Sequence, residues 1–331
     1  HVGLSGSATG VNYALVRSGV TVFTMAGTGS PLDFGLMTIS GIYTVTANNP
    51  STSCTATMSG STTVSVTAVP DSFAVTSTGS TSYCLGGTAP HIGLAGSVSG
   101  ISYQLYVGGM ATGSPVAGTG SALDFGIMSA GGTYTVVATN LSTGCTSNMI
   151  GSVTITVNPL PAVYTVTGGG SMCAGGSALS VGLSGSESGA HYQLYIGGVA
   201  TGGTVTGTGS SFNFGSYSTS GTYTVIATSA SGCVSTMSGS ASITINPLPT
   251  GYSVTGGGGY CAGGSGELVG LAGSQSGMTY QLYRGGSTAV GSPVTGTGAS
   301  ISFGLQTTAG SYSVVATNPG TSCTATMTGT V

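Results

Sequence analysis

Charged side chains are almost absent from this sequence. Only 2% of its 331 residues are charged, whereas ordinary soluble domains contain about 25%. The two basic residues are Arg17 and Arg284, and the five acidic ones are Asp33, Asp71, Asp124, Glu187 and Glu267. The net charge of -3 offers no basic surface for nucleic acid or an acidic membrane. So few titratable groups also argue against acid–base catalysis, and we expect no enzyme, no cofactor and no metal site.

Other absences narrow the fold class. No apolar run approaches 18 residues, so no membrane-spanning helix is predicted. Glycine accounts for 63 residues, but without the Gly-X-Y period of collagen. Hydrophobic residues make up 39% of the chain and alternate with polar ones in short runs, with no helical period. This pattern predicts a folded, all-β chain.

The sequence repeats with a period close to 90 residues. The phrase that begins Val2-Gly3-Leu4 returns at Ile92, Val181 and Val269, in steps of 90, 89 and 88 residues. A period of this length corresponds to one small domain per copy. The predicted domains are residues 1–69, 70–159, 160–247 and 248–331. The first lacks the early part of a repeat and the fourth the late part, so we expect the chain to be a stretch of a longer array.

Each repeat reads as an immunoglobulin-like β-sandwich. In the third repeat, about seven short alternating runs are separated by Gly, Ser and Thr, which is typical of a sandwich or barrel. A jelly roll or solenoid is the weaker alternative. Tyrosine occupies two recurring positions in the predicted core, one at the start of the penultimate strand and one where an antibody domain places tryptophan. These tyrosines are Tyr43, Tyr134, Tyr223 and Tyr312, and Tyr103, Tyr192 and Tyr280.

Short proline-containing segments join the repeats. Proline fixes φ and donates no backbone hydrogen bond, so these segments end one sheet without starting the next. Two prolines within four residues also make a stiff, extended spacer, and consecutive repeats should form a rod. The linker prolines are Pro70, Pro159, Pro161, Pro247 and Pro249.

Seven cysteines follow the same period. Cys84, Cys173 and Cys261 precede the Val-Gly-Leu phrase of their repeat, and Cys54, Cys145, Cys233 and Cys323 follow its penultimate strand. The simplest pairing is within repeats: Cys84–Cys145, Cys173–Cys233 and Cys261–Cys323, with a partner for Cys54 upstream of the chain start. Each bond would close a loop of about 60 residues, worth about 4 kcal/mol, and indicates an extracellular location.

Two other states of the cysteines stay open. In a strict immunoglobulin topology the early and late cysteines lie at opposite ends of a repeat, whereas bonded Cα atoms must come within about 7 Å. Bonds between successive repeats, Cys84–Cys233 and Cys173–Cys323, would resolve this, and free buried thiols are the third possibility.

Two recurring patterns resemble ligand sites, but simpler interpretations are favoured. Each late cysteine precedes a methionine by four residues, as Cys233 does Met237, which allows a soft-metal site but favours sulfur packing in the core. One strand position reads Asp33, Asp124, Asn213 and Ser302 in successive repeats. A calcium or catalytic carboxylate would not tolerate this change, so we expect a solvent-facing strand residue.

Several motifs together resemble a known group of proteins. In the third repeat these are Cys173–Ser177 (Cys-Ala-Gly-Gly-Ser), Gly221–Val225 (Gly-Thr-Tyr-Thr-Val), Gly232-Cys233 and Asn246–Pro249 (Asn-Pro-Leu-Pro). They are similar to the tandem Ig-like or PKD-like repeats of giant Bacteroidetes surface proteins, including gliding-motility adhesins of the SprB type. The resemblance covers the whole chain. It implies export by the type IX route and display as a fibre or adhesin stalk.

These observations favour a structural protein of the cell surface or the extracellular space. We expect a rod of Ig-like repeats that associates with copies of itself into a filament, because an uncharged surface permits close packing and leaves sheet edges unguarded. The alternative is an adhesin stalk that binds glycan, ice or another surface through flat threonine-bearing faces, such as Thr154 with Thr156, or Thr133 with Thr135 and Thr139.

Overall fold

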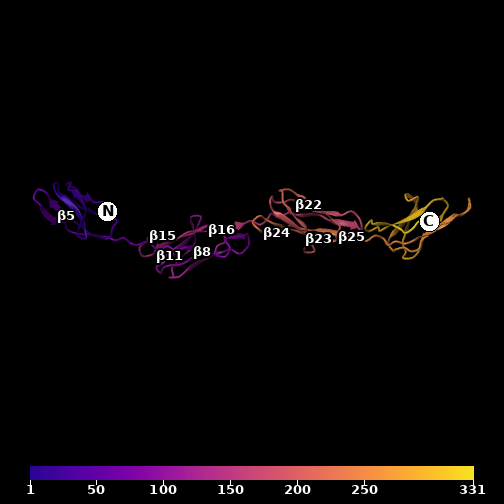
Figure 1. Cartoon of the computed structure of the whole chain (residues 1–331), viewed down its shortest axis with the longest axis horizontal. Helices are drawn as coiled ribbons and strands as arrows, with labels where there is room; N and C mark the ends of the chain where they lie inside the picture. Colours follow the sequence, from indigo (N-terminus) through magenta and orange to yellow (C-terminus); the bar gives the residue numbers. More distant parts are fainter. The chain divides into compact units, whose positions relative to one another are not determined.

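The computed structural model describes all residues, 1–331, and contains strands and no helices (Figure 1). The predicted all-β fold class is therefore confirmed. No helix is present that is long and apolar enough to cross a membrane. The chain divides into two compact units, His1–Val157 and Asn158–Val331. Each unit contains two of the sequence repeats, numbered 1 to 4 below in chain order.

Repeat 2 shows the architecture in full. A three-stranded sheet has the order β13 (Leu123–Ile127), β10 (His91–Leu94), β8 (Val75–Thr78). The second sheet has the order β12 (Met110–Ala117), β11 (Ile101–Val107), β14 (Gly132–Asn140), β16 (Val153–Asn158), β9 (Ser82–Cys84), with β15 (Thr146–Asn148) beside β14. Alternate residues of both sheets are buried in one core, for example Leu94 and Tyr103. This is the two-layer packing of an Ig-like sandwich.

Repeat 3 has the same plan. Its small sheet is β17 (Val166–Gly168), β19 (Leu179–Leu183), β22 (Phe212–Tyr217). Its large sheet is β18 (Gly170–Cys173), β25 (Ala241–Asn246), β23 (Gly221–Thr228), β20 (His191–Ile196), β21 (Val199–Thr206), with β24 (Val234–Thr236) beside β23. Strands β18 and β25 run parallel, and all other pairs between these strands are antiparallel.

Repeats 1 and 4 contain fewer strands within residues 1–331. In repeat 1, β1 (Gly3–Leu4) pairs with β4 (Leu32–Asp33), and the larger sheet is β3 (Val20–Ala26), β2 (Asn12–Arg17), β5 (Gly41–Asn49), β6 (Cys54–Thr57), with β7 (Thr62–Val64) also on β5. In repeat 4 the sheets are β26 (Val254–Gly256), β27 (Glu267–Leu271), β30 (Ile301–Gln306), and β29 (Thr288–Thr295), β28 (Thr279–Arg284), β31 (Tyr312–Thr317), β32 (Thr324–Thr326). Four separate hydrophobic cores result, each built from a single repeat.

The first set of tyrosines forms a tyrosine corner in every repeat. Tyr43, Tyr134, Tyr223 and Tyr312 are buried. Each hydroxyl donates to the backbone carbonyl four residues earlier, as Tyr223 does to Thr219 at 2.9 Å. Burial raises the pKa of the Tyr134 and Tyr223 hydroxyls, so both remain protonated donors at neutral pH. The corner fixes the turn that leads into the strand of the tyrosine itself, β5, β14, β23 or β31.

The second set of tyrosines explains why Gly-Thr-Gly recurs at residues 27–29, 118–120, 207–209 and 296–298. Tyr103, Tyr192 and Tyr280 are fully buried, as is nearly all of Tyr13 at the same position of repeat 1. Each hydroxyl accepts a hydrogen bond from the backbone N–H five residues earlier. The first glycine of Gly-Thr-Gly packs against this loop: a Cβ on Gly207 would lie 2.1 Å from the Glu187 carbonyl oxygen and 2.9 Å from the Tyr192 ring. Only glycine fits there, which accounts for the first position of the motif.

The last proline of each linker is buried. Pro70, Pro161 and Pro249 are buried, whereas Pro159 and Pro247 are exposed. The residue after each buried proline of the second unit is held by a loop side chain: Ala162 N–H donates to Glu187 at 3.1 Å, and Thr250 N–H to Gln275 at 3.2 Å. The linker is therefore anchored to the repeat that it enters.

Candidate functional site

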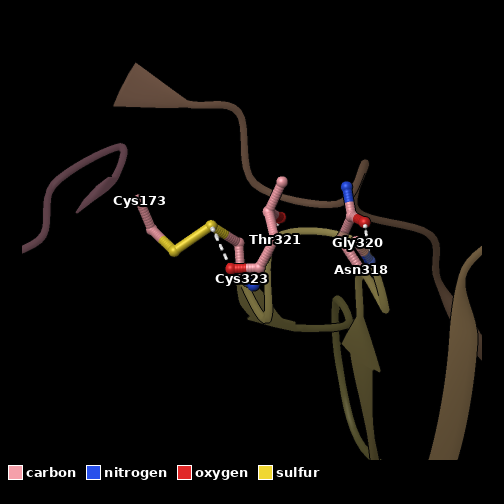
Figure 2. Close-up of a disulfide and its surroundings, with 5 residues drawn as sticks. All are labelled: Cys173, Asn318, Gly320, Thr321 and Cys323. Carbon is pink, nitrogen blue, oxygen red and sulfur yellow. Dashed lines mark hydrogen bonds between the residues drawn. A yellow bond between two sulfur atoms is a disulfide. The ribbon is translucent and has the colours of Figure 1, made fainter. Parts of the chain in front are cut away.

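A disulfide joins repeats 3 and 4. It links Cys173 to Cys323, with the Cα atoms 5.6 Å apart (Figure 2). Cys173 ends β18 and pairs in register with Asn246, the residue directly before Pro247. The early cysteine therefore lies at the end of repeat 3 from which the linker leaves. The bond closes a sequence separation of 150 residues, which is worth about 5 kcal/mol in the chain-entropy description.

Cys323 is held by a hydrogen-bonded loop between β31 and β32. The Asn318 side chain accepts from Gly320 N–H at 2.9 Å (Figure 2). Asn318 N–H donates to the Cys323 carbonyl at 2.8 Å. Ser322 completes the turn with φ of 58°, a left-handed conformation that is uncommon for a residue with a side chain. The Cys323 side chain is fully buried. The loop thus holds the Cys323 sulfur in a fixed place, at the end of the repeat 4 sandwich that faces Cys173.

The structure corrects the pairing within repeats. Cys173 bonds to Cys323 rather than to Cys233, and Cys145 and Cys261 are free thiols, as is Cys54. Cys84 and Cys233 are disulfide-bonded. The predicted Cys84–Cys145, Cys173–Cys233 and Cys261–Cys323 bonds are therefore wrong. The physical reason is the one that the alternative pairing rested on: the two cysteines of a repeat lie at opposite ends of the sandwich.

The methionines of the Cys-Met pairs pack in the cores of repeats 2 to 4. Met149, Met237 and Met327 are buried. Each thioether sulfur accepts a hydrogen bond of 3.4 Å from the backbone N–H of the first aromatic residue of its repeat, Phe73, Tyr164 or Tyr252. No group of three or more His, Cys, Asp and Glu side chains converges. The sulfur atoms therefore hold the segment just before β8, β17 or β26 against the segment just after β15, β24 or β32.

The variable Asp–Asn–Ser position has a role that the sequence interpretation missed. Asp33, Asp124, Asn213 and Ser302 are exposed, as expected. However, each side-chain oxygen accepts a hydrogen bond from the N–H of the glycine two residues later, at 2.7–3.1 Å. Those glycines all have positive φ, for example 94° at Gly126. Aspartate, asparagine and serine all carry a side-chain oxygen that can accept this bond, and the spacing to glycine is the signal that identifies this turn.

Repeats 1 and 2 add an ion pair at this turn. His1 Nδ1 lies 2.7 Å from Asp33 Oδ2, and His91 Nδ1 lies 2.8 Å from Asp124 Oδ2. The Gly126 N–H and, next, the His91 side chain hold the pKa of Asp124 below its usual range. Both pairs are solvent-exposed, so each contributes little to stability.

Solved structures match this chain at low sequence identity and low TM-score. A Ca2+-stabilised adhesin with which an Antarctic bacterium binds ice is 19% identical, with a TM-score of 0.38, over 98% of this chain and 90% of the other. Immunoglobulin domains 1–4 of Sidekick-1 are 12% identical, with a TM-score of 0.28, over 98% and 92%. A 1.5-MDa bacterial ice-binding adhesin is 14% identical, with a TM-score of 0.32, over 79% and 97%.

The family is defined by sequence. No curated protein matches the chain. A family described as Ig-like domain, CHU_C associated, matches residues 70–159 and 161–247, more than half of the chain. These ranges cover repeats 2 and 3, whose sheets and cores have the Ig-like arrangement. The prediction of tandem Ig-like repeats is thereby confirmed, and the chain belongs to this family of CHU_C-associated Ig-like domains.

Proposed function

We propose that the chain is a structural protein of the extracellular space, a rod of Ig-like repeats that packs with copies of itself into a cell-surface filament. The observation that carries the proposal is the Cys173–Cys323 disulfide. It connects consecutive repeats across a linker, where it limits hinge motion and adds nothing to an individual core. A catalytic or ligand-binding domain has no need of such a connection, whereas a load-bearing array does.

Two further features support an extracellular protein that packs with copies of itself. Disulfides persist in oxidising compartments, and four of the seven cysteines are disulfide-bonded. The near absence of charge removes the long-range repulsion that keeps most domains apart in solution. We propose domain ranges of 1–69, 70–159, 160–247 and 248–331, with stiff segments at the linker prolines.

Electron microscopy of the purified chain tests this function. We expect ordered fibres under oxidising conditions and less regular ones after reduction, because reduction releases the connection between repeats. The matched control is the Cys145→Ser variant, which removes a thiol that is already free. Single strings at every concentration, with or without reductant, would contradict a filament.

The second candidate is an adhesin stalk with a binding face. Thr133 and Thr135 on β14 and Thr154 and Thr156 on β16 are exposed on the outer face of one sheet, and the Thr133 and Thr154 hydroxyls lie 3.0 Å apart. Such a flat, uncharged face suits ice or glycan. Binding of the chain to ice or to a glycan array, lost when Thr133 and Thr154 are both replaced by valine, would favour this function over the filament.

A further inference from the structure

The exposed edge strand of the larger sheet carries a bulge in all four repeats, and the bulge is smallest in repeat 1. The edge strands are β3, β12, β21 and β29, each at the end of its sheet. In repeats 2 to 4 the register slips by two residues beside the core tyrosine, for example between Tyr103↔Val116 and Leu105↔Thr112. In repeat 1 the slip is a single residue, Val22, between Leu15↔Phe23 and Val16↔Thr21.

Two sequence features produce the larger interruption. A glycine with positive φ stands in each bulge: Gly113 at 64°, Gly202 at 65° and Gly291 at 61°. A glutamine on the neighbouring strand then holds the bulge. The amide nitrogen of Gln104 donates to the carbonyls of Thr112 and Gly113 at 2.9 and 3.3 Å, and Gln193 and Gln281 make the equivalent bonds. Repeats 2 and 4 also carry Pro115 and Pro293 in the same strand. A bulged edge with glycine or proline is a poor template for another strand.

Repeat 1 has lost all of these features together. Ala14 occupies the glutamine position, and β3 reads Val-Thr-Val-Phe-Thr-Met-Ala, without glycine, proline or charge. Val20, Val22 and Phe23 are 67%, 44% and 51% exposed. An uncharged strand of high β propensity with only a one-residue bulge, at a free edge, is a feature that natural sheets usually avoid.

We propose that β3 is a self-association edge, on which β3 of a second copy of the chain pairs antiparallel to form one continuous sheet. The proposal rests on the proposed function and names the surface through which copies would meet. The charge distribution favours a second copy as the occupant. On the neighbouring strand β2, Arg17 is the one charged residue, and it pairs with Val20 at one end of β3. In an antiparallel self-pair the two Arg17 residues lie at opposite ends, about 20 Å apart, which exceeds the screening length of about 8 Å at physiological salt.

The pair should be weak. A single pair of seven-residue strands falls at or below the low end of specific interfaces, about 1,000 Å². Because no ion pair contributes, we expect its strength to change little with salt. Repetition of the contact along a filament would add avidity.

Hydrogen exchange measured across a concentration series tests the edge. We expect protection of the backbone amides of Val20–Ala26 to rise with concentration, while those of β12, β21 and β29 do not change. The Val22→Lys variant should weaken self-association, measured by sedimentation equilibrium, at least about tenfold. The matched Val199→Lys variant, at an exposed position of β21, should change it less than about twofold. Thermal unfolding of both variants checks that they remain folded.

The outcomes separate this inference from the function. Protection of β3 that is independent of concentration, or equal losses from Val22→Lys and Val199→Lys, would overturn the self-association edge. If fibres still form in the Val22→Lys variant, the filament stands and the edge falls. If the wild-type chain forms a β3-dependent dimer but never fibres, the edge stands and the filament falls.

Discussion

Repeats 2 and 3 share a fold but differ in the state of the late cysteine and in the bonds at the turn formed by Asp124 or Asn213. Both have two sheets, a tyrosine corner and a second buried tyrosine with equivalent hydrogen bonds. They differ at the late cysteine: Cys233 is fully buried and disulfide-bonded, whereas Cys145 is a partly exposed free thiol. They differ again at the turn, where repeat 2 has a His91–Asp124 ion pair and repeat 3 has Asn213. The comparison teaches that each core is built within one repeat, whereas the late cysteine can differ in state between repeats that share the same core.

The largest expected effect tests the cysteine half of this comparison. Replacing Cys173 and Cys323 together by serine removes the bond that joins repeats 3 and 4. We expect a loss of about 2–5 kcal/mol in the free energy of unfolding, measured by native-state hydrogen exchange in repeat 4. The Cys145→Ser control should stay within about 0.5 kcal/mol of wild type. Equal losses in the two variants would mean that the bond has no stabilising role.

Removal of the tyrosine-corner hydrogen bond should lower the stability of repeats 2 and 3 by the same amount. Tyr223→Phe removes the hydrogen bond to the Thr219 carbonyl, and Tyr134→Phe removes the one to Ala130. We expect each change to lower the stability of its own repeat by about 1 kcal/mol, or up to about 3 if the carbonyl stays unsatisfied. Chemical denaturation followed by site-resolved exchange measures both. A loss in one repeat only would show that the cores are less equivalent than their geometry.

The side-chain oxygen of Asp124 should contribute more to stability than its negative charge does. Asp124→Ala removes the acceptor for Gly126 N–H, whereas Asp124→Asn keeps it, as Asn213 does for Gly215. The alanine variant should lose less than about 1 kcal/mol, because the site is exposed, and the asparagine variant less still. Thermal unfolding of the two variants side by side gives the difference. A greater loss for asparagine than for alanine would contradict the shared turn role.

The smallest effect is the acid sensitivity of repeat 2. The folded pKa of Asp124 is lowered from 3.8. This carboxylate therefore contributes stability that is present above its unfolded pKa and is lost as pH falls through the folded value. We expect a small decrease in the melting temperature below about pH 4 that is absent in Asp124→Asn. Asn213→Asp should introduce an acid dependence into repeat 3, and its absence there would assign the effect to His91 rather than to the turn.

Much of the fold follows from local patterns. Alternation over short runs predicted the strands, and the position of Tyr134 and Tyr223 before Val136 and Val225 predicted the corner, because both features depend on residues close in sequence. The partner of Cys173 could not be predicted in the same way, since its bond to Cys323 depends on which ends of repeats 3 and 4 meet. The turn at Asp124 was missed because its signal is a shared oxygen rather than a shared residue.

The sequence by itself determined the four-fold repetition, the all-β class and the buried tyrosines, since periodicity and side-chain polarity are enough to specify which face of a strand is covered. Only the tertiary structure decided that Cys173 bonds to Cys323 and that β3 is the one edge strand without a glutamine-held bulge. Both depend on strand register and on contacts between residues far apart in the chain, which a one-residue shift in pairing would change.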